Sequence, residues 1–97
     1  MTLDDFKASL ADPQPPAGLS PALQALWHAA QDDWHAAHEI AQDNPGAEAA
    51  WAHAHLHRQE GDLGNADYWY RRAGRSRPAT SLAAEWEAIG AALLGQR

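Results

Sequence analysis

Two histidines and one acid in the middle of the chain are spaced so that a helix would bring them to one face. His53, His57 and Glu60 stand at positions i, i+4 and i+7, a spacing that places side chains above one another on a helix. Two imidazoles one turn apart can chelate a transition metal, with the carboxylate as a third ligand or as a partner that orients one ring. His38 or His28 would complete this candidate metal site from a neighbouring helix. The alternative is that these histidines are buried, hydrogen-bonded packing residues.

Other catalytic patterns find little support in the sequence. An alanine follows His53, which excludes the H-E-x-x-H signature of metalloproteases. The sequence has no cysteine, which excludes thiolate zinc sites, disulfides and cysteine nucleophiles. The serines and threonines fall in expected helix caps and loops, so no activated nucleophile stands out. We therefore name no catalytic residue and favour a binding protein over an enzyme.

The composition of the 97 residues predicts an all-α domain. Apolar residues make up 45% of the chain, but alanine supplies 23 of them and valine is absent. Alanine has the highest helix propensity, whereas sheets are built from β-branched residues, which are scarce here. The net charge of −6 disfavours nucleic-acid binding. No segment is apolar enough to span a membrane, and the acidic N-terminus is unlike a signal peptide, so we expect a cytoplasmic protein.

Capping and breaking residues divide the chain into short helices. Thr2 with Asp5 resembles a capping box, Ser20 precedes a proline at a helix start, and glycine and proline mark the later turns. From these signals we expect helices over about residues 3–10, 21–32, 34–43, 47–60, 63–73 and 80–95. A proline-rich linker near residues 12–18 separates an N-terminal segment, residues 1–19, from a helical domain, residues 20–97.

The two central helix pairs repeat each other. A shift of 29 residues aligns four identical positions, and the helix and turn lengths match as well. These aligned pairs are Ala25 with Ala54, His28 with His57, Asp33 with Asp62, and Ala37 with Ala66. The sequence thus predicts two similar helical hairpins.

The chain resembles the tetratricopeptide repeat (TPR) over about residues 20–95, most strongly in the second hairpin and the last helix. The matching positions are Gly61, Ala66, Tyr70, Ala73 and Pro78, followed by Trp86, Ile89, Gly90 and Leu93. Ala50, His53, Ala54 and His57 depart from the family pattern. The resemblance implies two antiparallel hairpins, a C-terminal capping helix and a groove that binds a protein or peptide.

The same resemblance selects a partner-binding face. Trp51, His55, Arg58 and Gln59 fall where the family lines its groove, with Leu26 as a floor. Arginine can bind a carboxylate through two parallel hydrogen bonds, and tryptophan offers an aromatic platform. A protein- or peptide-binding module is therefore the first functional hypothesis, and a histidine-based metal or small-ligand site is the alternative. Two hairpins are fewer than the three repeats such folds usually need, so a homodimer is a further hypothesis.

A second resemblance is carried by three short segments. They are Trp34–Glu39, His53–Asp62 and Tyr68–Gly74. In these segments the chain is similar to a group of small bacterial proteins with no assigned activity, so this resemblance implies no function.

Overall fold

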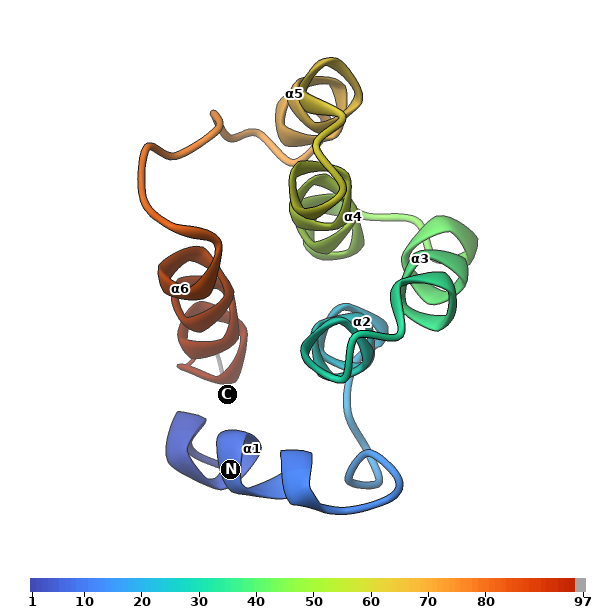
Figure 1. Ribbon diagram of the computed structural model, residues 1–97, viewed down its shortest axis with the longest axis vertical. Helices are drawn as coiled ribbons and strands as arrows, with labels where there is room; N and C mark the ends of the chain where they lie inside the picture. Colours follow the sequence, from blue (N-terminus) through green and yellow to red (C-terminus); the bar gives the residue numbers. More distant parts are fainter. Residues whose placement is uncertain (96–97) are drawn as a thin grey trace.

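The computed structural model describes residues 1–95, and over these residues it is all-helical (Figure 1). The elements are α1 (Leu3–Ala8) with the 3-10 turn η1 (Ser9–Ala11), α2 (Pro21–Ala30), α3 (Trp34–Asp43), α4 (Ala47–Gln59), α5 (Leu63–Arg72) and α6 (Leu82–Gly95). The described part of the chain contains no strand, which confirms the predicted all-α class. No helix within it is long and apolar enough to cross a membrane.

Local side-chain caps explain where the helices begin. The Thr2 hydroxyl accepts a hydrogen bond from the Asp5 amide, and the Asp5 carboxylate accepts one from the Thr2 amide, which completes the capping box. Ser20, one residue before Pro21, caps α2 through the Leu23 amide. These caps use groups within one turn of each other, so the predicted starts agree closely with the observed ones.

The turns before α3 and α5 have the same geometry. Asp33 and Asp62 both cap the following helix with their carboxylates. The residue before each cap has a positive φ, 59° at Asp32 and 88° at Gly61. The four alanines of the predicted 29-residue repeat are fully buried: Ala25, Ala37, Ala54 and Ala66. They allow α2 and α3, and likewise α4 and α5, to pack closely against each other.

Helix α4 lies at the centre of the fold, where it contacts α2, α3, α5 and α6 (Figure 1). Every residue from Ala49 to His57 is consequently buried. Positions two apart on a helix point about 200° from each other, so His53 and His57 share one face and His55 lies on the opposite one. Three histidines are thereby placed in the interior of the protein.

The N-terminal segment shares the core of the remaining chain. Phe6 is fully buried and stacks on Trp86 of α6 with ring centroids 5.4 Å apart. The Trp27 indole N–H donates to the Ser9 hydroxyl over 3.1 Å. Residues 1–19, expected as an arm and a linker, therefore pack against both α2 and α6.

Candidate metal centre

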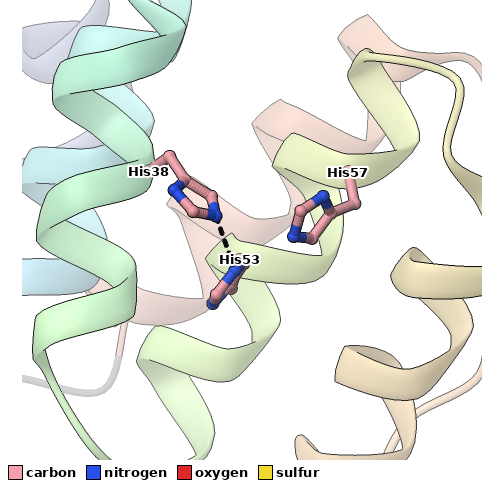
Figure 2. A group of neighbouring side chains, drawn as sticks. All are labelled: His38, His53 and His57. Carbon is pink, nitrogen blue, oxygen red and sulfur yellow. Dashed lines mark hydrogen bonds between the residues drawn. The ribbon is translucent and has the colours of Figure 1, made fainter.

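Three imidazoles meet between α3 and α4, and we call His38, His53 and His57 the imidazole trio (Figure 2). Each offers a ligand nitrogen, and these nitrogens all lie within 4.8 Å of one another. Nε2 of His38 and Nε2 of His53 are 3.1 Å apart and share a hydrogen bond, so without a bound ion one of them carries the proton (Figure 2). Two nitrogen ligands of a tetrahedral Zn²⁺, each about 2.0–2.1 Å from the ion, are separated by about 3.3 Å. Two members of the trio are thus already at the spacing of metal ligands.

Glu60 orients the third imidazole. Its Oε1 lies 2.9 Å from Nδ1 of His57, so this carboxylate accepts a hydrogen bond from Nδ1–H and leaves Nε2 free as a ligand. A carboxylate behind a histidine is the usual arrangement around bound metal ions. Of the two roles open to Glu60 from the sequence, the structure therefore supports the orienting one. His28, the other histidine considered for the site, lies on α2 outside the trio and packs against Trp27.

Two tryptophans pack against the imidazole trio, one on each of two of its rings. Trp34 stacks on His38 with centroids 4.6 Å apart, and Trp69 stacks on His53 at 3.9 Å. The Trp34 indole N–H donates to the carbonyl of Leu56 over 2.8 Å, which anchors this indole to α4. No sequence pattern connected either tryptophan with the histidines. The packing restricts the rotation of both imidazole rings.

Burial favours the neutral, metal-binding form of two members of the trio, His53 and His38. His53 is only 3% exposed, and this burial, followed by the nearby His57 and His38, lowers its pKa to about 4. Burial and His57 also lower the pKa of His38. Metal ions bind the neutral imidazole, so no proton has to leave His53 at neutral pH. Within residues 1–95, Nδ1 of His53 is buried without a hydrogen-bond partner.

The opposite face of α4 carries a different polar cluster, the Glu85 network. Glu85 of α6 accepts hydrogen bonds from Nδ1 of His55 over 2.8 Å and from Arg58 over 3.0 Å, both on Oε1. The hydroxyl of Tyr70 donates to Oε2, and burial together with this bond raises the pKa of Tyr70. Burial alone would raise the pKa of Glu85, but hydrogen bonds from His55, Tyr70 and Arg58 outweigh it and hold that pKa below its ordinary value.

Most of the residues predicted to bind a partner contact helix α6 or the segment that leads from α5 into it. His55 and Arg58 belong to the Glu85 network. Trp51 is 8% exposed, with the Arg75 guanidinium 3.4 Å from its ring centroid. Leu26 is buried, and its carbonyl accepts the indole N–H of Trp86 over 2.8 Å. Gln59 is half-buried.

Glu85 was not among the predicted site residues, although the sequence contains a signal for it. Glu85 immediately precedes Trp86 and stands four residues before Ile89, so it lies on the face of α6 that those two residues bury. A carboxylate on an apolar face requires cationic or hydrogen-bonding partners. The partners His55, Arg58 and Tyr70 come from α4 and α5, and no local spacing connects them to Glu85.

Comparisons with protein-family models, with curated proteins and with solved structures give no match for this chain. The interpretation of the imidazole trio is accordingly based on the geometry of its own residues.

Proposed function

We propose that this protein binds a divalent transition-metal ion, Zn²⁺ in the first instance, through the imidazole trio. The observation that carries the proposal is the 3.1 Å approach of Nε2 of His38 to Nε2 of His53, with the third imidazole of His57 within 4.8 Å. Imidazole nitrogen suits Zn²⁺, Cu²⁺ and Ni²⁺, whereas Mg²⁺ and Ca²⁺ prefer oxygen. The bound ion would use Nε2 of all three rings, and Glu60 would hold Nδ1 of His57.

Metal binding would also join two helices. His38 belongs to α3, whereas His53 and His57 belong to α4. An ion that binds only the folded protein stabilises it by about 2.7 kcal/mol at a free concentration 100 times its Kd. We therefore expect Zn²⁺ to raise the melting temperature and Mg²⁺ to leave it unchanged.

The test is calorimetric titration of the untagged protein with Zn²⁺, combined with thermal unfolding. We expect one ion per chain. His38→Gln should weaken binding more than about 100-fold, and Glu60→Ala, which removes only the orienting carboxylate, about 10- to 100-fold. His35→Gln is the matched control because His35 is exposed on the same helix as His38. Equal affinities of the His38 and His35 variants, or no stoichiometric uptake by the wild type, would overturn the proposal.

The protein- or peptide-binding module around Trp51, His55 and Arg58 stays a hypothesis, as do its TPR-like classification, a homodimer and a cytoplasmic location. A cavity of about 390 Å³ does border Trp51 and Arg75. A partner at this face would have to compete with Glu85 for His55 and Arg58. We favour the metal site because the carboxylate there, Glu60, holds Nδ1 of His57 and leaves its Nε2 free for an ion.

A further inference from the structure

A second cavity lies on the other side of α4 from the imidazole trio. It has a volume of about 300 Å³ and is bordered by the N-terminal segment, α2, α4 and α6. Most of its walls are apolar: Leu10, Ala29, Ala30, Leu82, Ala83 and Trp86. Two polar residues of α4, Gln59 and His55, also border it. An apolar pocket with a few convergent polar groups is the usual form of a small-molecule site.

His55 is the polar group built into this cavity. Its side chain is 3% exposed, and its Nδ1 is committed to Glu85. Nε2 is therefore the nitrogen left for the cavity, and no hydrogen bond to it occurs within residues 1–95. A neutral imidazole that donates from Nδ1 to a carboxylate presents Nε2 as an acceptor. Glu85 thus orients His55 to receive a hydrogen bond from whatever occupies the cavity.

Charges at the rim restrict the ligand. Asp32 and Glu87 border the cavity, and Lys7, the cation on the rim, pairs with Glu87 over 3.5 Å. The carboxylate of Glu85 behind His55 is paired with Arg58, so Asp32 remains as the unbalanced charge at the rim. An anionic ligand would therefore meet an excess of negative charge. The volume is at the lower limit for ligand pockets, which restricts the ligand to a compact molecule.

We propose that this cavity binds a small neutral alcohol or phenol, whose apolar body packs against the alanine, leucine and Trp86 walls and whose hydroxyl donates to Nε2 of His55. The site uses none of the imidazole trio. It can therefore be tested without metal, and its failure would leave the proposed metal centre untouched.

The first experiment compares three probes of similar size on isotope-labelled protein by NMR: benzyl alcohol, toluene and benzoate. The signals to follow are the indole N–H of Trp86 and the ring nitrogens of His55. We expect saturable binding of benzyl alcohol, about three- to tenfold tighter than toluene because toluene lacks the donor. Benzoate should bind more weakly than either. Equal affinities of benzyl alcohol and toluene, or shifts that do not saturate, would overturn the proposal.

Variants locate the binding. Ala83→Phe places a ring in the cavity and should weaken the binding of benzyl alcohol at least tenfold. Ala91→Phe is its control, because Ala91 is also exposed on α6 but does not border the cavity. His55→Phe should abolish the preference for benzyl alcohol over toluene. If that variant fails to fold, the comparison of Ala83→Phe with Ala91→Phe still tests the site. Equal affinities of these two variants for benzyl alcohol would contradict the proposal.

Discussion

The two faces of α4 bury histidines in opposite ways. On the side of α6, His55 meets a carboxylate that is also bound by Arg58 and Tyr70. On the side of α3 and α5, His53 and His57 meet another imidazole and a tryptophan ring. Buried polar groups are normally hydrogen-bonded, and the exceptions require an explanation. Both carboxylate oxygens of Glu85 accept hydrogen bonds, and these bonds join α4, α5 and α6. The imidazole trio has no such shared acceptor, and within residues 1–95 Nδ1 of His53 is buried without a partner.

The largest predicted effect is a loss of stability when the Glu85 network is broken. Glu85→Ala should lower the free energy of unfolding by about 3–5 kcal/mol, because it leaves the cation of Arg58 and the imidazole of His55 without their acceptor. Glu87→Ala is the control on the same helix. Its exposed ion pair with Lys7 is worth at most about 1 kcal/mol. Urea unfolding of both variants measures the difference, and comparable losses would mean that the Glu85 network does not hold the fold together.

The second prediction uses pH to examine the trio. Folded His53 has a pKa of about 4, lowered from 6.5, so between these values the unfolded chain binds the additional proton. The stability therefore falls as the pH drops through this window, by about 2.5 kcal/mol between pH 7.5 and pH 4.5. His53→Phe keeps a ring against Trp69 and should lack this contribution.

Urea unfolding of metal-free protein at several pH values measures this difference. His35→Phe, an exposed position on α3, should retain the full pH dependence of the wild type. If His53→Phe and the wild type lose the same stability on acidification, His53 is not the buried neutral group described above.

The smallest predicted effects concern the two matching turns that lead into α3 and α5. Gly61→Ala should lower the free energy of unfolding by about 1 kcal/mol, because a side chain at φ 88° is strained although the space around it is open. Asp32→Gly should raise it by about 0.5 kcal/mol, since glycine relieves the positive φ but adds freedom to the unfolded chain. Thermal unfolding checks both signs. Asp32→Gly should also leave Zn²⁺ affinity within about twofold, because the backbone that presents His38 is unchanged.

Much of the fold follows from local signals in the sequence. Caps at Thr2, Ser20 and Asp33 determine helix starts through groups within one turn of each other. The H-x3-H spacing on α4 likewise depends only on the helix period. The helix boundaries and the pairing of His53 with His57 on one face were therefore predictable.

The choice between His38 and His28 was not predictable from the chain alone. Both lie on helices before α4, and only the rotation of each helix decides which side chain reaches the trio. The contact between Glu85 and His55 was unpredictable for the same reason, because 30 residues separate the two and only helix packing brings them together. Arg58 meets Glu85 across a separation of 27 residues as well, a contact that no local spacing predicts.

The sequence by itself determined an alanine-rich chain of short capped helices with histidines at one-turn spacing, because propensity, capping and periodicity act between near neighbours. Only the tertiary structure decided that His55 would receive the carboxylate of Glu85 and that His38 would join His53 and His57. That outcome depends on how α3, α5 and α6 pack around α4, and each packed side chain takes its electrostatic environment from residues distant in the sequence.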